Sequence, residues 1–190
     1  MKIFQRAAAL GVGAVVALAL TGCGGGDDKS TTTAAVPEGW SELTTKGVDV
    51  AYPPAFKPQG DAERSKYNAA AATLTEGDRT VGIITVQLNF TTAHDAEQAA
   101  IAAEAGVQLG SKIEGTKKVE IAGTDDAQRI DFAFVSDGDK GQPVKGARIH
   151  GTIVTGLDSK DKTFAVRIDA QKGKLSDADL AKIVESIEVH

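Results

Sequence analysis

Apolar residues alternate with other residues along three successive segments in the second half of the chain, centred on 128–135, 147–154 and 163–170. Successive side chains of a β-strand point to opposite faces of a sheet, so a period of two residues is typical of strands. The alternating residues are Ile130, Phe132 and Phe134, then Ile149, Gly151 and Ile153, then Phe164, Val166 and Ile168. The pattern predicts three strands of a β-sheet.

Shorter apolar segments predict five further strands and a helix. The strands are expected at 40–43, 48–52, 69–74, 81–90 and 117–121, with turn residues between several of them. The alanine-rich segment 95–109 indicates a helix that begins after Thr92 or Asp95. Within it, Ile101, Ala105 and Leu109 recur at helical spacing.

A second helix is predicted near the end of the sequence. Ser176 and Asp179 resemble a capping box, and Leu175 is placed to contact Leu180 across the first turn. One apolar stripe follows, formed by Leu180, Ile183, Val184 and Ile187. The order is therefore four strands, helix, four strands, helix (ββββ-α-ββββ-α). It predicts an α+β fold in which two main helices pack on an antiparallel sheet.

The first 22 residues differ in composition from the rest of the chain. Lys2 and Arg6 give a basic start, and residues 7–20 are an uncharged run of 14 residues. That run suits the apolar region of a signal peptide, but it is shorter than the roughly 20 residues that span a bilayer as a helix. The sequence predicts a signal peptide over 1–22.

The apolar run ends in Leu20, Thr21, Gly22 and Cys23, and Cys23 is the only cysteine. This tetrad resembles the lipobox of bacterial lipoproteins. The resemblance implies that a diacylglyceryl transferase acylates the Cys23 thiol and that signal peptidase II, recognising Leu20, Thr21 and Gly22, cleaves before Cys23. An ordinary secretory signal that happens to contain a cysteine is the alternative. With Cys23 acylated, no thiol remains for a disulfide or a thiolate metal site.

The remaining sequence divides into a tether and one domain. Residues 23–36 comprise the lipidated cysteine and a small, polar spacer without periodicity, and 37–190 form a single globular domain. Without Lys2 and Arg6 the chain keeps 19 basic and 26 acidic residues, a net charge of −7. An acidic domain is not drawn to anionic lipid headgroups. We therefore expect anchoring at the extracytoplasmic side of the cell membrane through the lipid on Cys23 alone.

Two short segments carry a resemblance of the domain to a known fold. They are Val50-Ala51-Tyr52-Pro53, early in the domain, and Ile183-Val184-Glu185-Ser186-Ile187, in its last helix. With the order of elements, they are similar to the Mog1/PsbP-like fold, and especially to small actinobacterial lipoproteins of the LpqN/LpqT type. The resemblance covers most of 37–190 and implies a non-catalytic binding or assembly protein. It provides no catalytic residue to transfer.

The sequence offers little for nucleophilic catalysis. A catalytic triad requires a serine or cysteine activated by histidine, and the only histidines are His94, His150 and His190. No G-x-S-x-G motif is present to expose a serine. His94 precedes the predicted helix and is expected to be solvated. We expect that the protein is not an enzyme, although a catalytic site without a recognisable motif stays an alternative.

Metal and nucleic-acid sites are likewise not indicated. Residues 137–141 superficially resemble a calcium loop, but Arg148 stands where the closing glutamate should be. A hairpin turn is the simpler interpretation. The sequence pI near 5.2 argues against a nucleic-acid partner, which requires a basic face. We expect no metal and no cofactor.

One charged cluster is a candidate site. Arg129 and Asp131, Arg148 and His150, and Arg167 and Asp169 alternate with the apolar residues of the last three strands. If these strands are neighbours, the six residues lie on one face of the sheet. Arg129, Arg148, His150 and Arg167 then form an anion-binding face, because the arginine fork fits carboxylate and phosphate. Cross-strand charge pairs on a solvated face are the simpler alternative.

Two functional hypotheses follow. In the first, the protein is a tethered, non-catalytic binding or scaffold module that meets another protein of the cell envelope. In the second, it is a carrier of a lipid or of another small apolar or anionic ligand. A carrier requires a cavity of several hundred Å³, whereas a scaffold requires a filled core and an exposed apolar patch.

Overall fold

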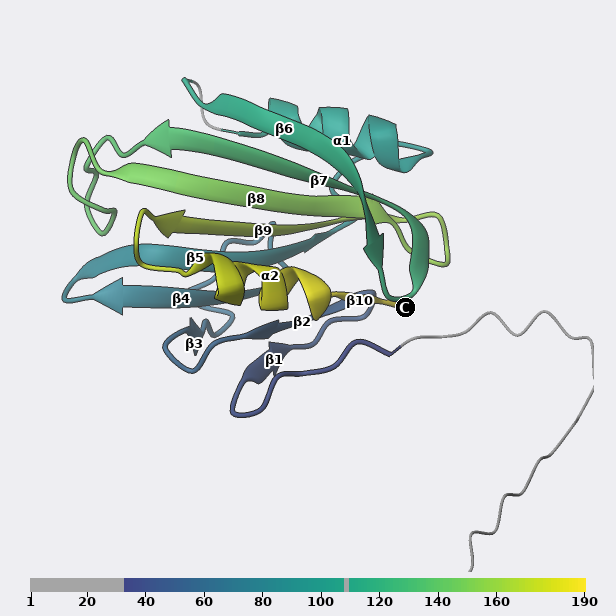
Figure 1. The fold of residues 1–190 in the computed structure, drawn as a ribbon, viewed down its shortest axis with the longest axis horizontal. Coiled ribbons are helices and arrows are strands. Elements are labelled where there is room, and N and C mark those ends of the chain that lie inside the picture. Colours follow the sequence, from purple (N-terminus) through teal and green to yellow (C-terminus); the bar gives the residue numbers. More distant parts are fainter. Residues whose placement is uncertain (1–32, 108–109) are drawn as a thin grey trace, which may run out of the picture. The chain divides into compact units, whose positions relative to one another are not determined.

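A seven-stranded antiparallel sheet dominates the computed structural model, which describes residues 33–107 and 110–190 (Figure 1). In spatial order its strands are β3 (Lys57–Pro58), β4 (Ala70–Glu76), β5 (Arg79–Leu88), β9 (Thr163–Gln171), β8 (Arg148–Leu157), β7 (Thr124–Val135) and β6 (Lys112–Ile121). Every neighbouring pair is antiparallel. The predicted signal peptide, with Leu20, Thr21, Gly22 and Cys23, lies outside the described residues.

A small sheet joins the start of the domain to its end. It consists of β1 (Ser41–Leu43), β2 (Val48–Tyr52) and β10 (Glu188–Val189), with β2 in the middle. The Glu188 carboxylate also accepts a hydrogen bond from the backbone N–H of Ala34, at 3.1 Å. The sequence did not predict β3 or β10, because two residues are too few to show any periodicity.

Helix α2 (Asp177–Glu185) begins as the capping box predicts. The Ser176 hydroxyl accepts a hydrogen bond from the backbone N–H of Asp179, at 3.0 Å. Ile183 and Val184 are buried against the small sheet and one face of the main sheet, and Leu180 packs at the edge of that core. The largest fully buried side chains of this core are Phe164, Ile84, Ile168, Ile183, Ile187, Val48, Val50, Val86, Val154 and Val166.

Helix α1 (Ala96–Ala105) packs through alanines. Asp95 caps it as predicted, accepting from the backbone N–H of Gln98 at 2.7 Å, but the helix ends before Gly106 rather than at residue 109. Ile101 does not face the core, since its side chain is 63% exposed. The buried residues are Ala96, Ala99, Ala100 and Ala103. Their small side chains let the helix approach β7, β8 and β9 closely.

The helices cover opposite faces of the main sheet, which we call the α2 face and the α1 face. Val166 and Ile168 of β9 join α2 in one core, whereas Ile130 and Phe132 of β7 join α1 in a second core. The alternating sets of β7 and β8 therefore share the α1 face, whereas the set of β9 lies on the α2 face. The sheet has an apolar core on each side, so the apolar members of different strands can point in opposite directions.

Candidate functional site

The predicted charged cluster is divided between the two faces of the sheet. Residues paired directly across antiparallel strands point to the same face. Three of the polar residues lie on the α2 face, because Arg129 pairs with Val154, Asp131 with Thr152 and His150 with Ala170. The other two lie on the α1 face, because Arg167 pairs with Ile153 and Asp169 with Gly151. The expectation of a single anion-binding face is therefore wrong for Arg167 and Asp169. The register of β9 against β8 is the cause.

Arg148 lies on the α2 face at the start of β8 but stands apart from the other residues. It pairs with Val135 across the strands, and its guanidinium is 3.6 Å from the carboxylate of Glu114 on β6. The Arg148 side chain is 55% exposed and that of Glu114 is 36% exposed, so solvent screens this ion pair and it contributes little to stability. Arg148 thus corresponds to the simpler alternative of a cross-strand charge pair.

A groove of about 900 Å³ opens on the α2 face. Its floor is formed by Gly115 and Lys117 of β6, by Arg129 and Asp131 of β7, and by His150 and Thr152 of β8; its wall is formed by Lys172, Gly173, Leu175, Ser176, Asp177 and Leu180 around the start of α2. The wall residues follow β9 directly in the chain. The groove exists because α2 covers only part of this face, and no sequence pattern indicates that limit.

A hydrogen-bonded network fixes the polar floor of the groove. The Nε and Nη2 atoms of Arg129 donate to Asp131 Oδ1, at 3.0 and 2.9 Å. The Thr152 hydroxyl donates to the same oxygen at 2.7 Å. Arg129 is only 20% exposed and is held by these contacts. Its guanidinium therefore presents its remaining N–H groups in a fixed orientation.

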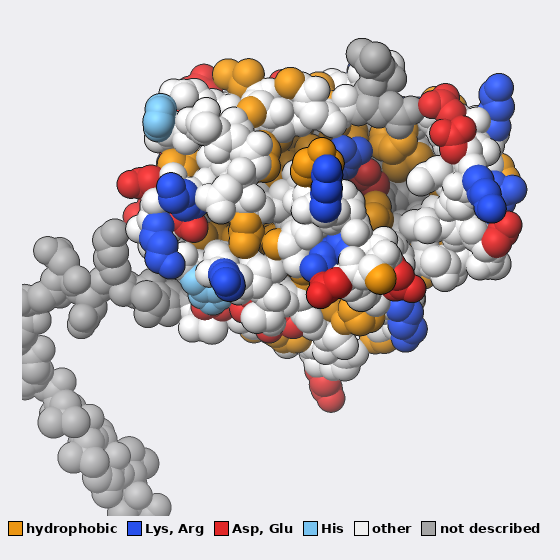
Figure 2. All heavy atoms as spheres, turned by 180° about the vertical axis from the view of Figure 1, so that it is seen from behind, with side chains coloured by type: hydrophobic (Ala, Val, Ile, Leu, Met, Phe, Trp, Pro, Cys, Tyr) orange, Lys and Arg blue, Asp and Glu red, His pale blue; other side chains and the backbone are white. Residues whose placement is uncertain are grey.

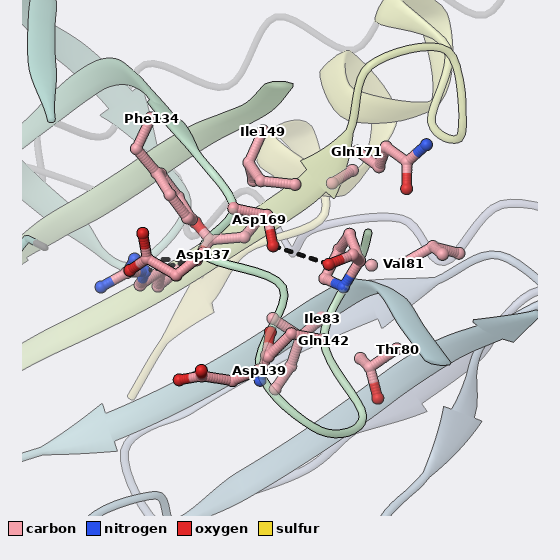
Figure 3. Close-up of a pocket in the computed structure, with 15 residues that line it drawn as sticks. Thr80, Val81, Ile83, Phe134, Asp137, Asp139, Gln142, Ile149, Asp169 and Gln171 are labelled. Atoms are coloured by element: carbon pink, nitrogen blue, oxygen red, sulfur yellow. Dashed lines mark hydrogen bonds and ion pairs between the residues drawn. The ribbon is translucent and has the colours of Figure 1, made fainter. Parts of the chain in front are cut away.

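A smaller pocket of about 400 Å³ lies on the α1 face. On this side of the molecule, hydrophobic, basic and acidic side chains gather in a hollow beside charged loops (Figure 2). Thr80, Val81 and Ile83 of β5 line the pocket, and the loop that carries Asp139 and Gln142 runs past them (Figure 3). The backbone N–H of Thr80 fixes this loop by donating to the carbonyl of Gly141, at 2.8 Å.

Arg167 and Asp169 are the charged pair in the wall of this pocket. The Nε and Nη2 atoms of Arg167 are both 2.8 Å from Asp169 Oδ2. Burial raises the pKa of the Asp169 carboxyl above its ordinary value of 3.8, and the neighbouring Arg167 charge opposes that shift. The other carboxylate oxygen, Oδ1, is buried and has no hydrogen-bond partner among the residues described.

Phe132 and Gly151 shape the strand surface beside this pair. A side chain at Gly151 would collide with the Phe132 ring, since a Cβ atom there would be 2.1 Å from the ring. The Arg167 guanidinium stands over the same ring, 5.1 Å from its centroid. A cation over an aromatic face is attracted to it. Gly151 thereby allows the ring to hold Arg167 beside Asp169.

The remaining sequence candidates do not gather into a site. His94 is exposed, and the segment 137–141 belongs to the loop between β7 and β8. Within residues 33–107 and 110–190, no group of three or more histidine, cysteine, aspartate or glutamate residues is arranged to hold a metal ion. No helix in these ranges is both long enough and apolar enough to cross a membrane.

Comparison with solved structures identifies the fold. The Ran-binding protein Mog1p of Saccharomyces cerevisiae superposes with a TM-score of 0.51 at 11% identity, covering 79% of this chain and 95% of Mog1p. The PsbP protein of Synechocystis (CyanoP) gives a TM-score of 0.44 at 9% identity, over 80% of this chain and 92% of CyanoP. No family model and no curated protein sequence matches the chain. The superposition on Mog1p therefore shows a Mog1-like fold, which agrees with the fold that the sequence resemblance implied.

Proposed function

We propose that this chain is a lipid-anchored protein of the extracytoplasmic membrane surface whose domain binds a small amphipathic ligand without catalysing a reaction. The observation that carries the proposal is the groove on the α2 face. Its volume of about 900 Å³ is within the range of small-molecule sites, roughly 300–1,000 Å³. The lipobox-like tetrad ending at Cys23 supports the anchor.

The groove combines two kinds of surface. Leu175 and Leu180 offer apolar area along the wall, while Lys117, Arg129 and His150 offer hydrogen-bond donors on the floor. Arginine recognises carboxylate and phosphate through its planar fork. A ligand with an acidic group over Arg129 and an apolar part along Leu180 satisfies both surfaces.

A protein-binding scaffold is less well supported by the exposed apolar side chains. A docking face requires a contiguous apolar patch. The large exposed hydrophobic residues are Val36, Tyr67, Ile101, Ile113, Val135 and Val144, which lie on different elements and loops of the described chain. Single exposed apolar residues are ordinary on protein surfaces. The groove therefore favours a small ligand over a protein partner.

Native mass spectrometry of the full-length chain, gently extracted from the membrane in which it is made, tests the proposal. The decisive variant is Gly115→Trp, because Gly115 lines the groove and a Cβ atom there meets nothing within 4 Å. The indole should fill the groove without disturbing a packed side chain. We expect the unmodified chain to carry a releasable small molecule and the variant to lose it.

Gly60→Trp is the matched control. Gly60 is also an exposed glycine with open space around its Cβ position, and it lies outside the groove. This variant should retain the small molecule. An unmodified chain without any bound mass, or a Gly115→Trp chain that keeps it, would contradict the proposal. A co-eluting protein subunit in place of a small molecule would favour the scaffold.

A further inference from the structure

We propose that the pocket on the α1 face is a second, independent site, which binds a small zwitterion with an apolar side chain, such as an aliphatic α-amino acid. It lies on the opposite face of the sheet from the groove and is lined by other residues, except Ala170 and Gln171. The inference does not depend on the ligand of the groove. Its volume of about 400 Å³ is at the lower end of the range for small-molecule sites.

Asp169 supplies an unused acceptor in the wall of the pocket. Its side chain is only 14% exposed, and its buried Oδ1 atom lacks a donor among the described residues, so the carboxyl group must turn toward the pocket for a ligand to reach that oxygen. Buried polar atoms in folded proteins nearly always have a hydrogen-bond partner, so such an exception requires an explanation. An ammonium group is the strongest complement, because it brings both donors and a positive charge to the carboxylate.

Arg167 supplies donors beside that acceptor. Its Nε and Nη2 atoms contact Asp169 Oδ2. A guanidinium has five N–H donors, so several remain for a ligand carboxylate. The Phe132 ring under the guanidinium keeps this fork in place. Arg167 and Asp169 thus present complementary charges to the two ends of a zwitterion.

The rest of the lining specifies the ligand further. Val81, Ile83, Phe134 and Ile149 contribute apolar surface, which suits an aliphatic side chain. The carboxylates of Asp139, on the bordering loop, and of Asp169 outnumber the single guanidinium of Arg167, which makes the lining net acidic. An excess of negative charge at the pocket disfavours a simple anion. A ligand that carries an ammonium group beside its carboxylate is therefore preferred.

Isothermal titration calorimetry with L-leucine tests this inference on the full-length lipidated chain in lipid nanodiscs. Two further probes each lack one charged group: 4-methylpentanoate has no ammonium, and 3-methylbutylamine has no carboxylate. We expect leucine to bind and both of these probes to bind at least tenfold more weakly. Equal binding of either probe, or no binding of leucine, would overturn the proposal.

Asp169→Asn is the decisive variant and Asp131→Asn its matched control. Each aspartate follows an arginine by two residues and pairs with it, but Asp131 lies on the opposite face of the sheet. Asp169→Asn should weaken leucine binding at least tenfold, and Asp131→Asn should leave it within twofold. Thr80→Trp, at the half-buried start of β5, is a second variant: its indole should fill the pocket without altering the Arg167–Asp169 pair. Unchanged leucine affinity in a folded Asp169→Asn or Thr80→Trp chain would refute the site.

Discussion

At the scale of single residues, Asp169 gives the domain an unusual dependence on pH. Because burial raises the pKa of this carboxyl above 3.8, the folded state holds the proton more tightly than the unfolded state does. The stability contribution of Asp169 is therefore fully present below about pH 4 and is lost as the pH rises through the folded pKa. Most paired carboxylates behave in the opposite way, because their pKa is lowered.

Asp169→Asn removes this titration, so the two proteins should diverge with pH. We expect the free energy of unfolding of the unmodified chain, minus that of the variant, to fall as the pH rises from about 4 through the folded pKa. Urea denaturation followed by the fluorescence of Trp40, the only tryptophan, measures both proteins at each pH. Other titrating groups are common to the two chains and largely cancel. A difference that stays constant or rises with pH would show that burial does not raise the pKa of the Asp169 carboxyl.

At the scale of elements, α1 is where sequence spacing and packing disagree. Ile101 is exposed, whereas Ala100 is buried against the second core. Ile101→Ala should change the free energy of unfolding by less than about 0.5 kcal/mol, as for most surface changes. Ala100→Ile should lower it by about 1–3 kcal/mol, because the helix has no room for a larger side chain. Urea denaturation measures both variants. The reverse order of effects would mean that α1 presents Ile101 to the sheet.

Helix caps and strand positions were predictable because they depend on neighbouring residues. Asp95 and Ser176 accept the capping hydrogen bonds that their side chains predicted. The face of each strand was not predictable, because it depends on what covers the sheet. In β8, residues 151–156 are buried without interruption, so alternation there cannot identify a face. The candidate cluster was accordingly divided, with Arg129 and His150 on one face and Arg167 on the other.

At the scale of the whole molecule, the two binding proposals rest on one architectural fact. The main sheet is wider and longer than the elements that cover it, so each face keeps a part that no helix covers. The α2 face keeps the groove around Arg129, and the α1 face keeps the pocket around Asp169. Such a layout places the two proposed sites back to back across a single layer of backbone, so two Arg–Asp pairs that are spaced alike in the sequence line different cavities.

The proposed lipid anchor on Cys23 concerns the whole chain rather than the folded domain alone. The sequence after residue 22 has a net charge of −7, so attraction to anionic lipid should not hold it at a membrane, and the proposed anchor is the lipid on Cys23 alone. We expect the unmodified protein to stay in the membrane fraction through a 1 M salt wash, to begin at Cys23 and to carry a diacylglyceryl mass there. Cys23→Ser should lack that mass and keep residues 1–22, because cleavage follows acylation of the thiol. Ser30→Ala, in the tether, should behave as the unmodified chain. Intact-mass spectrometry of the three proteins measures both properties, and an unmodified chain that lacks lipid at Cys23 would identify a secreted protein instead.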